Sequence, residues 1–224
     1  DIGEYWTWFA DLTVQANGHA TRDNIAEALY TTDARSGRYP TPLPDPGGPN
    51  DVIVLMTPPE NNAVGTGDED GLEGLGADSS THTLGGCRAV DGDLLEYFRS
   101  RPDKLFVIVT APPLVDVETT IEEAGDARVL NDWLVHDWLQ DADWANRNVY
   151  VWDLFNVLTS DDNHHRFDQG RLVHEQVDLS DSAAYPRAPG DSLPDEIGCF
   201  KATSEFVPVL NVFFNRWQHW RAVK

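Results

Sequence analysis

Leu105-Phe106-Val107-Ile108-Val109 is an unbroken apolar run that has the length of a β-strand. Two further runs of the same kind occur, at Val52–Met56 and at Val149–Trp152. None of them alternates with polar residues, and this is typical of strands that are covered on both faces, as in a parallel sheet. These runs therefore decide the fold class, which we predict to be α/β.

Helical patterns separate the three runs. Val90, Leu94, Tyr97 and Phe98 share one stripe, a second stripe runs from Leu130 to Trp138, and the strongest runs from Phe206 to Trp217. In the last, Pro208 is tolerable if it falls in the first turn. Alternating strands and helices predict a parallel sheet with helices on both faces, in one domain spanning 1–224. Three strands are few for this length, so we expect the sheet to lack one or two N-terminal strands. Residues 160–198 are expected to form a long loop.

The charge of the chain is strongly negative. Its 38 acidic and 16 basic residues give a formal charge of -22, which argues against binding nucleic acid or an anionic membrane through general electrostatics. The acidic residues are spread along the whole sequence. This pattern is typical either of a surface adapted to high salt, where charges are screened over a few ångströms, or of an ordinary acidic secreted protein.

Several features bear on the compartment. No run of 18 apolar residues is present, so we expect no membrane insertion. The sequence starts with Asp1, so either a signal or pro-segment has been removed or the chain continues upstream, and we predict a secreted or extracytoplasmic protein. The two cysteines, Cys87 and Cys199, form either one long-range disulfide or two free thiols.

Ligands of open parallel sheets bind at the carboxyl ends of the strands, so the segments that follow each run are of interest. Several uncommon strings occur in order there and beyond: FVIVTAPP at 106–113, ARVLNDWL at 127–134, NVYVWDLFNVLT at 148–159, NHHR at 163–166, GDSLP at 190–194 and KATSEFVPVLN at 201–211. In this order they resemble a bacterial group of secreted SGNH-hydrolase-like (GDSL-like) proteins, over essentially the whole chain.

The resemblance implies a three-layer αβα, flavodoxin-like sheet and a catalytic site built from five residues. These are a serine after the first strand, a glycine and an asparagine of the oxyanion hole, and an aspartate and a histidine before the last helix. Asn61 lies roughly where the family has its asparagine, and Asp191 is retained. Leu193, however, stands where the resemblance calls for histidine, and no segment carries the serine.

Two functions remain open. With serine and histidine both missing, the first is an extracellular binding or structural/assembly protein with a degenerate triad, whose sheet is completed by an N-terminal fragment or another chain. The second is an active hydrolase or lyase, acting on polysaccharide or acyl esters, with a non-standard site. Its candidate catalytic residues are Asn61, His164, His165, His174 and Asp191.

The alternatives for these residues are structural. The His164-His165 pair also fits a solvated turn, and His136 and His219 are isolated enough for a structural role. Asp68 and Asp70 lie in an acidic glycine-rich loop that fits either a Ca²⁺ site or a solvated loop, and no other cofactor is expected. The aromatic opening Tyr5–Phe9 fits either a platform for polysaccharide or core packing.

Overall fold

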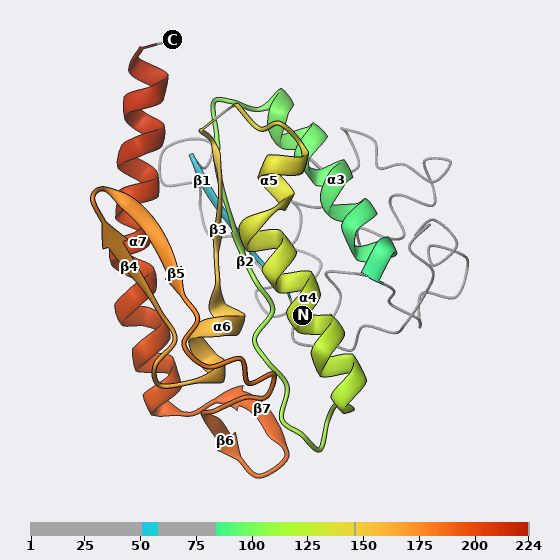
Figure 1. Cartoon of the computed structure of the whole chain (residues 1–224). Coiled ribbons are helices and arrows are strands. Elements are labelled where there is room, and N and C mark those ends of the chain that lie inside the picture. The colour runs from blue at the N-terminus through green and yellow to red at the C-terminus, as the bar shows by residue number, and fades with distance from the viewer. Residues whose placement is uncertain (1–50, 58–83, 146, 224) are drawn as a thin grey trace, which may run out of the picture.

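A computed structural model describes residues 51–57, 84–145 and 147–223 of the chain (Figure 1). Its centre is a parallel sheet with the order β1-β2-β3, formed by β1 (Val52–Met56), β2 (Leu105–Val109) and β3 (Val149–Trp152). In the register of the sheet, Val107 pairs with Val54 on one side and with Tyr150 on the other. The three predicted strands are confirmed, and so is the α/β class.

Helices cover both faces of the sheet (Figure 1). One face carries α3 (Leu84–Ser100), α4 (Ile121–His136) and α5 (Trp138–Asp141), and the other carries α6 (Leu154–Thr159) and α7 (Glu196–Ala222). The central strand β2 is buried along its whole length. Its Phe106 and Ile108 pack with α3 to α5, whereas Leu105, Val107 and Val109 pack with α6 and α7. This alternation is the period of two that a strand imposes on its side chains.

The predicted stripe from Leu130 to Trp138 is divided between two helices. α4 begins with a capping box, in which Thr120 Oγ1 accepts a hydrogen bond from Glu123 N at 3.1 Å and Thr120 N donates one to the Glu123 carboxylate at 2.8 Å. The helix ends at His136, and Trp138 opens the short helix α5, where its side chain is buried.

The edge strand β1 is less covered than its neighbours. Val54 is 45 % and Met56 is 37 % exposed, although both belong to an apolar run. Among the described strands, β1 pairs only with β2. Residues 1–50 lie outside the described part of the chain, so the expectation of missing N-terminal strands stays a prediction.

Two hairpins occupy the segment from 160 to 198, which the sequence had indicated to be a long loop. β4 (His164–Asp168) pairs with β5 (Arg171–Glu175), and β6 (Pro186–Ala188) pairs with β7 (Asp191–Pro194). The loop prediction was wrong because these short strands are polar and largely exposed, and therefore show no apolar alternation. The first hairpin turns at Gln169 and Gly170, where φ is 47° and 77°.

The final helix begins well before its apolar stripe. Asp195 caps α7 by accepting a hydrogen bond from Gly198 N at 2.8 Å. Pro208 consequently lies inside the helix and not in its first turn, because residues 196–205 are helical too. By length and composition alone α7 could cross a membrane. Its Val209, Phe213 and Trp217 are buried against the sheet, as in a core helix.

The two cysteines are not bonded to each other. Cys87 on α3 is buried and Cys199 on α7 is exposed, and both are free thiols. Burial raises the pKa of the Cys87 thiol, as does the nearby charge of Asp91. Of the two alternatives left by the sequence, the structure therefore shows the free thiols.

Two helical glycines should respond in opposite ways to alanine. A Cβ on Gly198 would lie 2.7 Å from Tyr185 Cβ and 3.1 Å from Pro194 Cβ, whereas a Cβ on Gly125 of α4 would meet nothing within 4 Å. We expect Gly198→Ala to lower the free energy of unfolding by about 1–3 kcal/mol through overpacking. Gly125→Ala should raise it by about 0.5–1 kcal/mol through helix propensity. Urea titration of both variants measures this, and stabilisation by Gly198→Ala would show that the contact with Tyr185 is absent.

Candidate functional site

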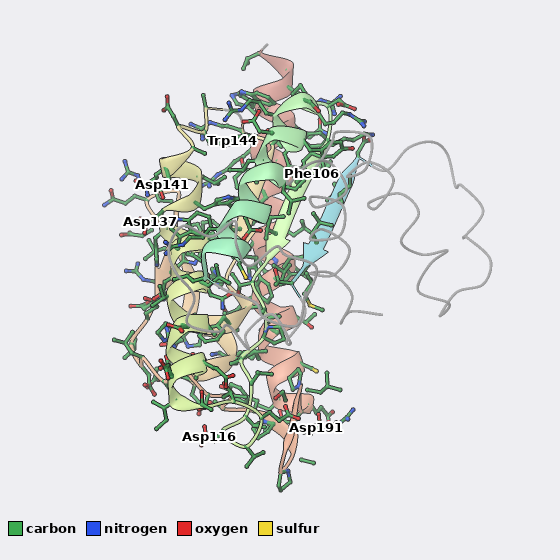
Figure 2. The ribbon with its side chains drawn as sticks, turned by 90° about the vertical axis from the view of Figure 1, so that its right-hand side faces the viewer. Phe106, Asp116, Asp137, Asp141, Trp144 and Asp191 are labelled. Carbon is green, nitrogen blue, oxygen red and sulfur yellow. The ribbon has the colours of Figure 1, made fainter. Side chains whose placement is uncertain are left out.

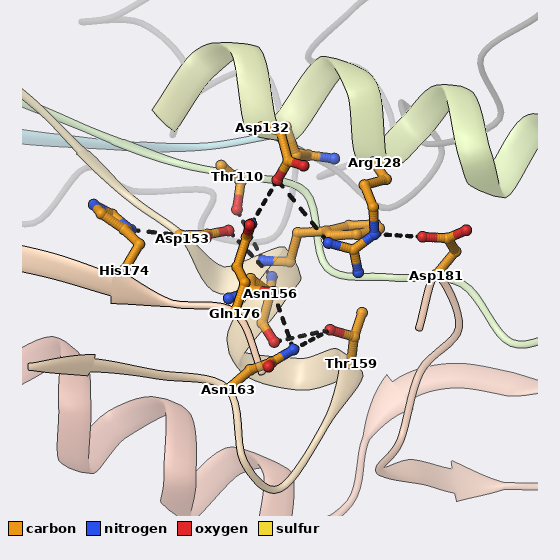
Figure 3. Close-up of polar contacts among 12 residues, drawn as sticks. Thr110, Arg128, Asp132, Asp153, Asn156, Thr159, Asn163, His174, Gln176 and Asp181 are labelled. Atoms are coloured by element: carbon orange, nitrogen blue, oxygen red, sulfur yellow. Dashed lines mark hydrogen bonds and ion pairs between the residues drawn. The ribbon is translucent and has the colours of Figure 1, made fainter. Parts of the chain in front are cut away.

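A polar cluster lies at the carboxyl ends of β2 and β3, where α6 begins (Figure 3). Thr110 follows β2, and its Oγ1 accepts a hydrogen bond from Phe155 N at 2.8 Å. Asp153 follows β3, and its Oδ1 caps α6 by accepting from Asn156 N at 3.1 Å. Both side chains are buried. The sheet thus brings together polar groups that lie 43 residues apart in the sequence, at the edge where ligands of such sheets bind.

His165 is fixed in this cluster through both of its ring nitrogens. Its Nε2 accepts a hydrogen bond from Asp153 N at 3.3 Å, so the proton of the neutral ring is on Nδ1, which lies 3.2 Å from Glu205 Oε2. The ring also stacks on Trp152, with 5.8 Å between centroids, and its side chain is 2 % exposed. An imidazole held in this way has no free nitrogen with which to accept a proton from a substrate.

Glu205 of α7 joins both histidines of the pair. Its carboxylate accepts hydrogen bonds from His165 N at 2.9 Å and from His164 Nδ1 at 2.9 Å, in addition to the contact with the His165 ring. Burial alone would raise the pKa of Glu205. The hydrogen bonds from His165 and His164 outweigh it and hold this pKa at about 2, against an ordinary value of 4.5. Glu205 is therefore ionised at neutral pH, and its carboxylate orients the hairpin β4–β5 on α7.

His174 of β5 lies beside Asp153 without a hydrogen bond to it. Its Nδ1 is 3.7 Å from Asp153 Oδ2, and neither atom has a hydrogen-bond partner among the described residues, although both are buried. The ring meets His165 edge to face at 4.6 Å between centroids, and meets His136 at 5.7 Å. A carboxylate beside an imidazole is the pair that orients a general base in hydrolases.

A second polar layer joins α4 to the segment that follows β5 (Figure 3). The guanidinium of Arg128 contacts the carboxylate of Asp181 and the Ser180 carbonyl, and lies 5.2 Å from the centroid of the Phe155 ring. Gln176 Nε2 donates to Asp132 Oδ1 at 2.7 Å. Burial raises the pKa of Asp132. These contacts fix the residues 176–181 against α4 and cover the cluster from that side.

Asn163 is a buried hub that the sequence had not indicated. Its Nδ2 donates to Asn156 Oδ1 at 3.0 Å, to Thr159 Oγ1 at 3.2 Å and to the Asp178 carbonyl at 2.7 Å. Its Oδ1 accepts from Val177 N at 2.8 Å and from Asp178 N at 2.9 Å. The only signal in the sequence was its place at the start of NHHR, a string that drew attention to the histidines.

Lys201 closes the cluster from α7 and was also missed. Its Nζ donates to the carbonyls of Val157, Ser160 and Asn163, at 2.7 Å for the first and the last. Burial lowers the pKa of Lys201, while the charge of Glu205 raises it. Because all three donors of the ammonium group are used, Lys201 is a structural cap for the end of α6.

Asp191 lies apart from the histidines, in the hairpin β6–β7. Its carboxylate accepts from Leu193 N at 3.0 Å and from Arg187 Nε at 2.8 Å, and both contacts lower its pKa. Figure 2 shows Asp191 at the same end of the molecule as Asp116. Leu193 is 49 % exposed. Of the predicted site residues, the structure thus brings His164, His165 and His174 together but does not join Asp191 to them through any contact of the described residues.

The remaining candidates cannot be placed. Asn61, Asp68 and Asp70 lie outside the described residues. Within the described ranges, no group of three or more His, Cys, Asp or Glu side chains is arranged to hold a metal ion.

No protein-family model matches the chain, and neither a curated protein nor a solved structure is significantly similar to it.

Proposed function

We propose that this chain is an extracytoplasmic SGNH-hydrolase-like domain with a degenerate triad, which binds or assembles with other molecules and does not hydrolyse esters. The observation that carries the proposal is that no histidine of the expected triad is available as a base. His165 uses both ring nitrogens within the fold, and Leu193 occupies the place in the GDSLP turn where the resemblance calls for histidine. Asp191, the retained acid, is paired with Arg187.

The edge strand supports the assembly part of the proposal. β1 exposes Val54 and Met56, and among the described strands it pairs only with β2. An edge of this kind presents unpaired backbone groups that accept another strand. On this proposal, the segment that completes the sheet is an N-terminal stretch of the same polypeptide or another chain.

One observation favours a second function, an active hydrolase or lyase. His174 Nδ1 and Asp153 Oδ2 are both buried, unpartnered among the described residues and only 3.7 Å apart. A small closure would make this pair an Asp-His couple that activates water or a nucleophile. Among the described residues, however, His174 Nδ1 has no hydrogen-bond partner, so no described serine or cysteine is bonded to it.

Turnover of 4-nitrophenyl acetate and 4-nitrophenyl butyrate by the full chain tests the proposal. We expect rates equal to those without protein, because the loss of serine and histidine from a triad removes most of its rate enhancement. The matched variants are His174→Gln, which removes the only imidazole with an unpartnered buried nitrogen in the described part, and the exposed His219→Gln. Turnover that disappears in His174→Gln but persists in His219→Gln would overturn the proposal and establish the second function.

A further inference from the structure

A groove of about 950 Å³ lies between the C-terminal half of α7, the turn of the hairpin β4–β5 and the chain that enters β3. It is near the amino end of β3, which Arg147 precedes, whereas the histidine cluster lies at the carboxyl end of that strand, where His165 contacts Asp153. Its lining includes Arg147, Arg171, Leu172, Arg216, His219 and Trp220. The groove shares none of its lining residues with the site described above.

The charge of this groove is opposite to that of the chain. Three of the 13 arginines line it together with His219, in a protein whose formal charge is -22. None of the described residues that line it is an aspartate or glutamate. A chance gathering of guanidinium groups without carboxylates is unfavourable, because like charges repel and the acids of this chain outnumber its bases.

Among the described residues, the guanidinium groups are also left without carboxylate partners. Arg147 and Arg171 are exposed and form no ion pair with a described acid. The nearest acid in the ladder, Asp168, faces Arg171 across the hairpin, but its carboxylate lies 3.8 Å from Arg166. Arg216 donates to the Gly170 carbonyl, and this contact fixes the turn on α7.

Tyr150 of β3 feels the charges of two of these side chains. Its ring stacks on Phe213 of α7 with 4.3 Å between centroids. Burial raises the pKa of Tyr150, and the charges of Arg216 and Arg147 both act to lower it. Arg216 on α7 and Arg147 before β3 thus both line the groove and both lie close enough to Tyr150 for their charges to act on it.

We propose that this groove binds a small oxyanion, either a carboxylate or a phosphate group, carried on a ring-shaped or hydrocarbon body. The guanidinium fork donates two parallel hydrogen bonds to such a group, which makes arginine the preferred residue for recognising it. Trp220 and Leu172 form an apolar wall for the body that carries the charge. The net negative charge of the protein repels long polyanions. A small anion that contacts only the positively charged groove avoids this repulsion.

Isothermal titration calorimetry on the full chain, at about 0.1 M ionic strength where charges are screened beyond ~10 Å, tests the site. The probes are D-galacturonate, inorganic phosphate and the uncharged D-galactose. We expect at least one oxyanion to bind and D-galactose not to bind. Tighter binding of D-galacturonate identifies a carboxylate ligand, and tighter binding of phosphate identifies a phosphate ligand.

The variants separate the groove from general electrostatics. Arg147→Gln/Arg171→Gln removes two exposed groups without ion pairs to described acids, so the fold is expected to persist. It should weaken binding about tenfold or more, the equivalent of one charge-assisted hydrogen bond. The matched control is Arg166→Gln on the same hairpin, whose side chain is outside the groove and already pairs with Glu175 at 2.9 Å. It should leave binding unchanged.

Two results would overturn the inference: neither oxyanion binds, or an oxyanion binds the double variant as tightly as the unchanged chain. Equal binding of D-galactose and D-galacturonate would overturn it as well. The outcome is independent of the function proposed above, because ester turnover and oxyanion binding are measured separately and depend on different residues.

Discussion

Replacing Asn163 by alanine should lower the free energy of unfolding by about 3–4 kcal/mol, because the buried Asn156 Oδ1 and Thr159 Oγ1 and several part-buried backbone groups lose their partner at once. Each such group costs about 1–3 kcal/mol when buried, and less when part-buried, unless it finds a new partner. The groups left behind include the peptide N–H of Val177 and Asp178 and the Asp178 carbonyl. Urea denaturation followed by tryptophan fluorescence measures the change.

Asn215→Ala is the matched control. Asn215 is exposed on α7, and its Nδ2 donates to Asn211 Oδ1 at 3.3 Å, its only hydrogen bond among the described residues. Its replacement should change the free energy of unfolding by less than about 0.5 kcal/mol. A loss below about 1 kcal/mol for Asn163→Ala would mean that the segment 176–181 does not depend on this hub.

Glu205 should make stability depend on pH below neutrality. Its pKa in the folded chain is about 2, below its ordinary value of 4.5. A carboxyl group with a depressed pKa stabilises the fold above its ordinary pKa, and this contribution is lost as the pH falls towards the folded value. The contribution is about 3 kcal/mol at neutral pH and disappears between about pH 5 and pH 2. We therefore expect Glu205→Gln to be less stable than the unchanged chain near neutral pH, and the two to converge near pH 2.

Unfolding titrations at pH 7, 5, 4, 3 and 2 measure this convergence. The control is Glu175→Gln, since Glu175 has a side chain that is 43 % exposed where it pairs with Arg166. An exposed pair of this kind contributes about 1 kcal/mol or less. A difference between Glu205→Gln and the unchanged chain that is the same at every pH would contradict the role of the carboxylate charge.

The central sheet could be predicted because burial on both faces leaves an unmistakable trace in the sequence. Phe106 and Val107 must both be apolar, as each faces a different layer of helices. The hairpins left no such trace. His164 to Asp168 form a strand whose stability comes from contacts such as those of Glu205, 40 residues away from His165, and these cannot be seen in a local pattern.

Only part of the candidate site was predicted, because only some of its residues stand out in the local sequence. Imidazoles near strand ends attract attention, and His165 and His174 do lie together. Asparagine and lysine carry no comparable signal, so Asn163 and Lys201 were missed although they hold the cluster together. The net charge was informative about the whole surface but not about its parts, since it gave no hint of three arginines around one groove.

The contacts of Lys201 also determine how this side of the molecule can open. The carbonyls that it holds belong to α6, to the residue after it and to the start of the first hairpin, while Glu205, one turn further along α7, holds β4. The first turns of α7 cannot separate from the sheet without releasing α6 and the hairpin at the same moment. Helix and hairpin are thus a single cooperative opening unit, and a ligand that stabilises either part must slow the fluctuations of both.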